Sequence, residues 1–299
     1  MALLDRAIAR VLPAVPKPVV RRLAAPYIAG RALEDAVEVV GRLNGERKLA
    51  TIDVLGEEVT TADAAREIAQ AYHRVLARIE GEKLDSNISV KLTGFGLELD
   101  YGLCRENLEA VAEDARIRGN FVRIDMEDSS TTAATLQLYR ELHASGRENI
   151  GVVLQAYLRR TLDDAVGLAN VRLCKGIYLE PASIAFHDPD EIRDNFRATL
   201  RVLFDQGSYV GIATHDEALI VDALTQVRER GLSPDRYEFQ MLLGVRASRG
   251  DELVRAGHRL RVYVPFGTHW YEYSMRRLQE NPAIAGYVAV DTVKRLARR

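Results

Sequence analysis

A stretch near the C-terminus, YEYSMRRLQENP, places two adjacent arginines between a tyrosine three residues before them and a glutamate three residues after them. In a helix, residues at i, i+3, i+4 and i+7 share one face, and here these are Tyr273, Arg276, Arg277 and Glu280. Two adjacent guanidinium groups suit a carboxylate or phosphate, and Glu280 can hold an arginine in place. The same pattern also occurs on solvated helix faces, so its meaning depends on what the fold places opposite it.

The elements that must position these groups follow a regular pattern. Short β-branched segments recur from residue 49 onward, with helical periodicity between most of them. The segments span 49–56, 87–93, 121–127, 150–157, 171–178, 209–216, 237–242 and 260–267. Eight strand–helix units in about 250 residues predict a (β/α)8 barrel of the TIM type, with an open doubly wound sheet as the alternative. We expect an N-terminal helical arm over residues 1–45 and a catalytic barrel over 46–299, which includes the paired-arginine helix.

Polar side chains stand at the C-terminal end of nearly every predicted strand, where such barrels place their chemistry. They are Asp53, Glu57, Lys91, Asp125, Glu127, Gln155, Tyr157, Lys175, Tyr178, Thr214, His215, Gln240 and Tyr263. The paired-arginine segment follows the eighth strand, so it can lean over the same rim. Together with Lys91 it offers three cations, while Tyr263 and Tyr273 supply flat walls with polar tips. The sequence therefore predicts a site for a small, partly apolar carboxylate.

Composition narrows the class of protein. The net charge of -2 argues against a nucleic-acid binder held by overall charge. No apolar run reaches the ~18 residues that a membrane span needs, and the arginine-interrupted N-terminus is unlike a secretory signal. The two cysteines, Cys104 and Cys174, fit reduced thiols of a cytoplasmic protein. His215 lacks a second histidine at ligand spacing, so we predict no metal site.

Nine motifs occur in an order that resembles the proline dehydrogenase family. They are DVLGE, SVKLT, RIDMED, LQAYLRR, VRLCKGIY, ATHD, YEFQMLLG, RVYVPFG and YEYSMRRLQEN, the last matching Y-x-x-R-R-x-x-E. The resemblance covers nearly the whole barrel. It implies a distorted (β/α)8 barrel that binds flavin non-covalently, usually FAD, and oxidises L-proline to Δ1-pyrroline-5-carboxylate. It also implies electron transfer to a membrane quinone, and at this length a monofunctional bacterial form without an aldehyde dehydrogenase domain.

The same resemblance implies a role for individual residues. The proline carboxylate would meet Lys91, Arg276 and Arg277, with Glu280 orienting the arginines and Glu57 acting as a gate. The proline ring would lie against Tyr263, Tyr273, Leu242 and Ile177. Asp125, Arg172 and Tyr263 would be the catalytic residues, with Arg172 near the reactive nitrogen of the flavin. The flavin itself would be held by Met126, Gln155, Arg172, Lys175, Gly176, Ile177, Tyr178, Thr214 and His215.

Two departures from the family pattern concern the fifth strand, which reads KGIYL where the family has K-G-A-Y, often followed by an aromatic residue. Ile177 is bulkier than alanine beside the substrate, and Leu179 cannot stack on a flavin or its adenine. FAD therefore remains the expected flavin, with FMN as the alternative. The basic N-terminal segment is typical of a helical arm packed on the barrel, with peripheral contact to the inner face of the cell membrane as the alternative. A pyrroline-5-carboxylate dehydrogenase is the expected recipient of the product.

Two other functions remain open at this stage. Lys91 or Lys175 at a strand end can form a Schiff base, as in the aldolases that barrels also host, which would make the protein a lyase. Alternatively, the chain is a carboxylate-binding or membrane-docking protein that has the barrel but no turnover. Protein that is yellow and bleaches with L-proline would distinguish the flavoenzyme from both.

Overall fold

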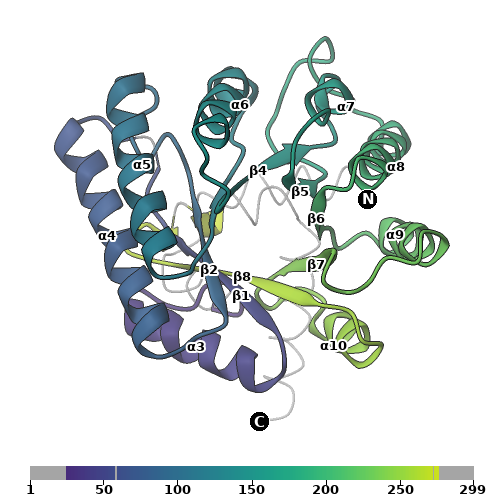
Figure 1. Cartoon of the computed structure of the whole chain (residues 1–299), viewed down its shortest axis with the longest axis horizontal. Coiled ribbons are helices and arrows are strands. Elements are labelled where there is room, and N and C mark those ends of the chain that lie inside the picture. Colours follow the sequence, from purple (N-terminus) through teal and green to yellow (C-terminus); the bar gives the residue numbers. More distant parts are fainter. Residues whose placement is uncertain (1–24, 58, 272, 276–299) are drawn as a thin grey trace, which may run out of the picture.

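Eight parallel strands close into a barrel, as the computed structural model shows (Figure 1). The structure describes residues 25–57, 59–271 and 273–275. The strands are β1 (Leu49–Val54), β2 (Ser86–Val90), β3 (Val122–Ile124), β4 (Ile150–Gln155), β5 (Asn170–Cys174), β6 (Tyr209–Ala213), β7 (Tyr237–Leu242) and β8 (Leu260–Phe266). Each strand pairs with the next along the chain, and β1 pairs with β8. Because the sheet closes, it has no free edge, and all eight C-terminal strand ends meet at one mouth.

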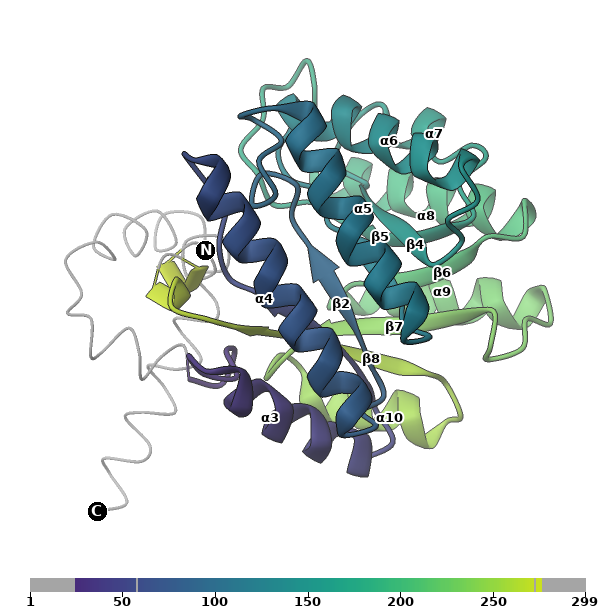
Figure 2. The same ribbon diagram turned by 60° about the vertical axis from the view of Figure 1, so that its left-hand side comes forward.

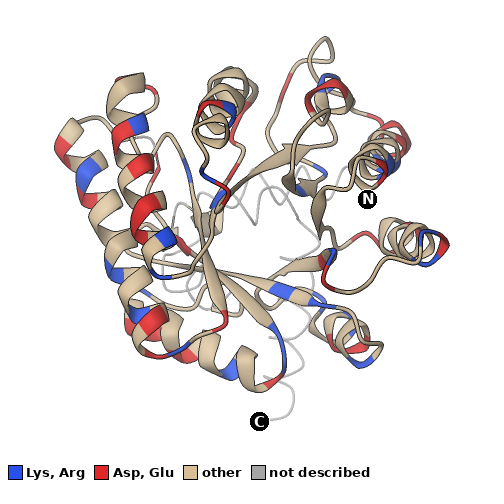
Figure 3. Ribbon diagram, in the orientation of Figure 1, with Lys and Arg blue, Asp and Glu red and all other residues tan. Residues whose placement is uncertain are grey.

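Helices surround this barrel and alternate with its strands (Figure 2). They are α3 (Leu33–Gly45), α4 (Ala62–Gly81), α5 (Tyr101–Ile117), α6 (Ser129–Ala144), α7 (Thr161–Asp164), α8 (Pro189–Asp205), α9 (Glu217–Glu229) and α10 (Ala247–Arg255). Several begin at an aspartate whose carboxylate accepts a backbone N–H, as Asp100, Asp128 and Asp188 do. Positions of basic and acidic residues are interspersed along the outer helices (Figure 3). No helix of the described chain has the length and apolar character needed to cross a bilayer.

The two faces of the strands differ in polarity. Side chains such as Ile52, Val122 and Leu173 are fully buried in the apolar layer that includes the helices. Their neighbours in sequence are polar, as Asp53, Arg123 and Arg172 are, and these are also buried. Alternation along a strand sends these two sets to opposite faces. The hydrophobic core therefore lies between barrel and helices, while the barrel interior is largely polar.

The structure confirms the predicted barrel and rules out the open sheet, because β1 and β8 are joined in register. Each of the eight predicted segments contains a strand, although β3 is only three residues long where 121–127 was expected. The C-terminal part of the proposed arm is α3, which contacts β1 and β8. The division of the chain at residue 45 stays a prediction. Arg276, Arg277 and Glu280 lie outside the described residues.

Candidate active site

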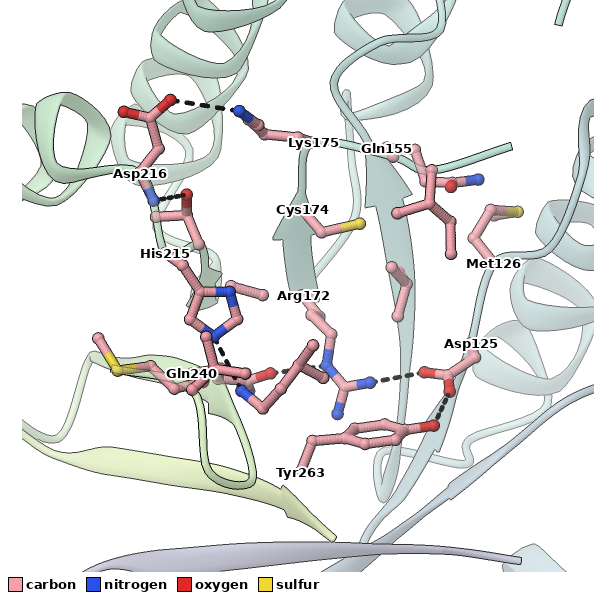
Figure 4. Close-up of a pocket in the computed structure, with 18 of the residues that line it drawn as sticks. Asp125, Met126, Gln155, Arg172, Cys174, Lys175, His215, Asp216, Gln240 and Tyr263 are labelled. Carbon is pink, nitrogen blue, oxygen red and sulfur yellow. Dashed lines mark hydrogen bonds and ion pairs between the residues drawn. The ribbon is translucent and has the colours of Figure 1, made fainter. Parts of the chain in front are cut away.

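A buried network of charged side chains joins strands that are not neighbours in the barrel (Figure 4). Arg172 of β5 donates from Nη1 to Asp125 Oδ1 at 2.6 Å and from Nε to Gln240 Oε1 of β7, also at 2.6 Å. Tyr263 of β8 donates its hydroxyl to Asp125 Oδ2 at 2.9 Å. The guanidinium carbon of Arg172 lies 5.3 Å from the centre of the Tyr263 ring. Contacts between strands so far apart in the sheet can form only inside the barrel, so these residues share its interior.

A second group of charges surrounds Lys91, just beyond the end of β2. The ammonium nitrogen lies 2.9 Å from both carboxylate oxygens of Asp53 and 3.5 Å from Glu57 Oε1. It also lies 3.7 Å from Asp125 Oδ2 and 3.2 Å from the Tyr263 hydroxyl, which connects it to the Arg172 network. Three carboxylates thus face two cations, so this group carries a surplus of negative charge.

Burial and these partners shift the ionisation of the group. Burial lowers the pKa of Lys91, but the adjacent carboxylates and Tyr263 outweigh it and hold that pKa well above its ordinary value. Burial raises the pKa of Asp125, yet Arg172 and Lys91 bring it below its usual range. Burial and the nearby carboxylates raise the pKa of the Tyr263 hydroxyl well above 10. At neutral pH Lys91 is therefore charged, Asp125 is ionised, and Tyr263 keeps its proton.

A cavity of about 550 Å³ opens beside this network, lined mainly by the C-terminal ends of β4 to β8. All nine residues predicted to hold a flavin line it: Met126, Gln155, Arg172, Lys175, Gly176, Ile177, Tyr178, Thr214 and His215. Of the predicted substrate and catalytic residues, Lys91, Asp125, Leu242 and Tyr263 also line it. The structure thus brings the two predicted sets of residues to one cavity.

Two predicted site residues lie apart from the lining. Tyr273 is buried, but it belongs to a small apolar cluster with Ile28 and Leu55. Glu57 approaches Lys91 without bordering the cavity. Its predicted partner in the gate is an arginine outside the described residues. The roles of Tyr273 and Glu57 therefore stay predictions.

A glycine and two side-chain contacts shape the cavity wall at the ends of β5 and β6. Gly176 has φ of +99°, and a Cβ at this position would lie 2.0 Å from Cδ1 of Tyr157. Only glycine fits so close to the ring in this conformation. His215 accepts a hydrogen bond at Nε2 from the backbone N–H of Leu242, at 3.0 Å, so its own proton is on Nδ1. Lys175 is held by Asp216 at 3.2 Å.

The donors around this cavity fit a hydrogen-bonding ring system that gains negative charge on reduction, such as a flavin. The Nη2 group of Arg172 is buried, belongs to a residue that lines the cavity, and has no hydrogen-bond partner among the described residues. A buried unpaired donor is costly unless a bound molecule supplies the acceptor. Gly176 lets backbone approach the cavity closely, and Lys175 adds a second cation. No group of three potential metal ligands occurs in the described chain.

Some residues of the network had no role in the prediction from sequence. Asp53 and Gln240 were recognised only as polar groups at strand ends, and Ser89 was missed. The Ser89 hydroxyl donates to Asp125 Oδ1 at 2.7 Å and accepts from Arg172 Nη1 at 3.1 Å. Strand alternation could have indicated Ser89, because it stands two residues before Lys91 and so shares its face.

The fold and this site together define a barrel enzyme with a buried charge network beside a ligand cavity. A family model described as proline dehydrogenase matches residues 36–290. Proline dehydrogenase 1 of Bacillus subtilis (strain 168) is 38% identical over 273 residues, which cover 90% of each chain. The proline dehydrogenase of Deinococcus radiodurans is 34% identical and covers 91% of this chain and 90% of that one. The chain belongs to the proline dehydrogenase family, which is a family of oxidoreductases.

More distant relatives are larger. The bifunctional protein PutA of Escherichia coli (strain K12) is 24% identical, and the match covers 96% of this chain but 26% of that protein. A crystal structure of proline utilization A from Bdellovibrio bacteriovorus, inactivated by N-propargylglycine, superposes with a TM-score of 0.82 at 22% identity. That match covers 92% of this chain and 36% of the other, and it supports the same barrel fold.

Proposed function

We propose that this protein oxidises L-proline to Δ1-pyrroline-5-carboxylate with a bound flavin, FAD being preferred over FMN. The observation that carries the proposal is the position of Arg172. This one cation lines the cavity of the predicted flavin residues and binds Asp125 of the predicted substrate site at 2.6 Å. A substrate beside Asp125 and a flavin beside Arg172 would therefore be neighbours, as transfer between them requires.

The charges around Lys91 suit a zwitterionic amino acid. The described part of the site holds three carboxylates and two cations, which are Asp53, Glu57 and Asp125 with Lys91 and Arg172. The excess negative charge would stabilise the cationic amine of a bound amino acid. The substrate carboxylate needs a cation of its own beyond those already paired. Arg276 and Arg277 are the proposed source of that charge, and Glu280 would orient them. Lys91 would add its own positive charge. Leu242, Ile177, Tyr263 and Tyr273 would enclose the apolar ring, and Glu57 would close the site.

The flavin would be held by Gln155, Lys175, Thr214 and His215, with the backbone at Met126, Gly176 and Tyr178 alongside. When bound, it supplies the two-electron acceptor for a hydride leaving the ring carbon beside the proline nitrogen. The proline nitrogen first releases one proton to solvent, and its lone pair then forms the C=N bond as the hydride leaves Cδ, the ring carbon that does not bear the carboxylate. Loss of the remaining nitrogen proton to solvent gives the neutral imine of the product. Arg172 would stabilise the negative charge that arrives with the electrons, and Asp125 keeps that guanidinium in place.

The ionisation of the site disfavours the Schiff-base lyase. A nucleophilic lysine must lose its proton, whereas the carboxylates around Lys91 hold its pKa well above the ordinary value. Lys175 is paired with Asp216 at the far side of the cavity. Nothing in the geometry favours carbonyl chemistry at either residue.

The electron acceptor, location and partners belong to the same proposal. Membrane quinone would reoxidise the flavin, with the protein in the cytoplasm and its basic N-terminal segment in peripheral contact with the inner face of the membrane. The product would pass to a pyrroline-5-carboxylate dehydrogenase. The similarity to proline dehydrogenases over most of their length supports the family membership on which these assignments rest.

Anaerobic titration of the purified protein tests the proposed function. A yellow protein should lose its flavin absorbance on addition of L-proline and regain it with a quinone analogue. Extraction of the cofactor and chromatography would distinguish FAD from FMN. A colourless protein that borohydride links covalently to a carbonyl substrate would instead establish the lyase and overturn the proposal.

A further inference from the structure

The side chain of Arg172, on β5, is held in its orientation by Gln240, which belongs to β7. Its Nε donates to Gln240 Oε1 at 2.6 Å, on the side of the guanidinium opposite Asp125 (Figure 4). A guanidinium can turn about its side-chain bonds, so contacts on two sides are needed to fix its plane. Gln240 supplies the second contact only if its carbonyl oxygen, and not its amide nitrogen, faces Arg172.

A buried carboxylate decides which way this amide points. Gln240 Nε2 donates to Glu238 Oε1 at 2.6 Å, and Glu238 is 1% exposed. Despite burial, the interactions with Arg261 and Tyr209 lower the pKa of Glu238 to about 2, so it is ionised at any working pH. An ionised carboxylate only accepts hydrogen bonds. The NH2 end of Gln240 must therefore face Glu238, which turns the carbonyl end towards Arg172.

The carboxylate of Glu238 is itself held firmly. Arg261 of β8 donates to it from Nε at 2.7 Å and from Nη2 at 3.1 Å. The hydroxyl of Tyr209, on β6, donates to Glu238 Oε2 at 2.9 Å. Glu238 and Gln240 are two residues apart on β7, so both point into the barrel. The orientation of Arg172 thus traces back to a layer of the barrel that does not border the cavity.

A glycine gives the amide its space. Gly211 of β6 stands opposite Arg172 on one side and Glu238 on the other in the strand register. A Cβ at Gly211 would lie 2.3 Å from Gln240 Nε2. Its φ is outside the left-handed region, so alanine would be acceptable to the backbone there. A methyl group at Gly211 would therefore act mainly by displacing the Gln240 amide.

We propose that Gln240 and Glu238 are positioning residues that, with space provided by Gly211, hold the Arg172 guanidinium in the orientation that serves the flavin. The inference rests on the proposed function for the role of Arg172. Gln240 borders the cavity, whereas Glu238 and Gly211 do not. Measurements in an Arg172→Met background therefore separate a direct effect of Gln240 on the flavin from one that passes through the arginine.

Gly211→Ala, Gln240→Met and Glu238→Gln test the proposal, each as the full-length flavin-loaded protein. Glu238→Gln replaces a carboxylate that only accepts hydrogen bonds with an amide that can accept or donate. The Gln240 amide could then turn its nitrogen, instead of its oxygen, towards Arg172. For each variant, the reduction potential of the bound flavin and the rate of its reduction by L-proline are measured. We expect the potential to become more negative, as it should in Arg172→Met, because the reduced flavin loses a well-placed cation. The rate should fall roughly tenfold to a hundredfold, the range seen when residues that orient metal ligands are replaced, with the KM for L-proline changed less than about threefold.

Gln226→Met is the matched control, because Gln226 is a similarly buried glutamine, on α9, that makes no contact with Arg172. It should leave potential and rate at the wild-type values. The same three changes made in an Arg172→Met background should add nothing further to the potential. If the potentials of Gly211→Ala and Gln240→Met equal that of wild type, or if the shifts persist without Arg172, the positioning role is wrong. Should wild-type flavin fail to be reduced by L-proline while the variants still shift its potential, the proposed function fails and the positioning role stands.

Discussion

Arg172 and Asp125, which come from β5 and the end of β3, form a buried ion pair with 2.6 Å between Nη1 and Oδ1. The pair joins the two halves of the proposed site, since Arg172 borders the predicted flavin residues and Asp125 borders Lys91 and Tyr263. Replacing Asp125 would leave the buried Arg172 guanidinium without its carboxylate partner, whereas replacing Arg172 would leave Asp125 with Lys91 as a more distant cation, at 3.7 Å. This connection makes the site sensitive to single substitutions in ways that can be measured.

Arg172→Met should give a folded protein that is reduced slowly by proline. The cation is proposed to stabilise charge that appears as the hydride is transferred, so the loss should fall mainly on kcat. Removing one such electrostatic donor costs about 3 kcal/mol, on the order of a hundredfold. Stopped-flow measurement of flavin bleaching decides the matter. A reductive half-reaction at the wild-type rate would show that Arg172 has only a structural role.

Arg276→Met and Arg277→Met should each weaken proline binding. Loss of one member of a desolvated charge pair costs about 2–5 kcal/mol, or roughly thirty- to several-thousandfold. The carboxylate keeps its charge through the reaction, so KM should rise more than kcat falls. Lysine at either position should restore binding only in part, because it cannot make a planar two-pronged contact. Flavin content is the internal control and should stay constant. A KM within threefold of wild type in both variants would return this segment to an ordinary solvated helix.

Glu127 should make folding stability depend on pH in the neutral range. Its carboxylate is bonded to the backbone N–H and hydroxyl of Thr93, but burial dominates and raises its pKa from 4.5 to about 7. The folded state therefore holds a proton that the unfolded state has lost, and stability falls as pH rises from about 4.5 to 7. Two and a half pKa units correspond to about 3 kcal/mol.

Glu127→Gln isolates this effect, because glutamine resembles the protonated acid and does not ionise. Urea unfolding of both proteins at pH 5 and pH 8 gives the comparison. The variant should gain up to about 3 kcal/mol relative to wild type between the two pH values. Parallel changes in the two proteins would mean that Glu127 is ionised in the folded state throughout.

Gly176→Ala should damage the cavity wall. Alanine would be strained at φ of +99° and its Cβ would meet the Tyr157 ring at 2.0 Å. Gly146→Ala is the matched control, since φ there is +91° and no atom lies within 4 Å of the added Cβ. The control should lose about 1 kcal/mol of stability from backbone strain alone. Gly176→Ala should lose more and should also retain less flavin, as judged by absorbance after gel filtration. Equal flavin retention in the two variants would place Gly176 outside the cofactor site.

Removal of residues 1–24 eliminates the basic side chains of the N-terminal segment but leaves Ile28 in its cluster with Leu55 and Tyr273, and it should weaken attachment to anionic vesicles. Basic residues near an anionic surface contribute roughly 1 kcal/mol each, so several give weak, salt-sensitive binding. Co-sedimentation with vesicles measures the binding, and proline oxidation with a soluble dye shows that the truncated protein still works. Equal co-sedimentation by the full-length and truncated proteins would make the segment a packing arm.

The sequence by itself determined the strand positions, the polar residues at their ends and the family. Strand periodicity shows which residues share a face, and the C-terminal ends of barrel strands are where ligands bind, so Lys91, Asp125 and Tyr263 could be selected together. The nine ordered motifs were specific enough to indicate the family that the comparisons confirm.

The tertiary structure decided which of these residues touch. Arg172 meets Gln240 at a separation of 68 residues, and Tyr263 meets Asp125 at a separation of 138. Such pairs depend on how the sheet closes and in what register, and a local pattern contains neither quantity. The contact between Glu238 and Arg261 could not be predicted from the sequence for the same reason. Strand alternation predicts which side chains face the barrel interior, but not which residue of another strand each one contacts.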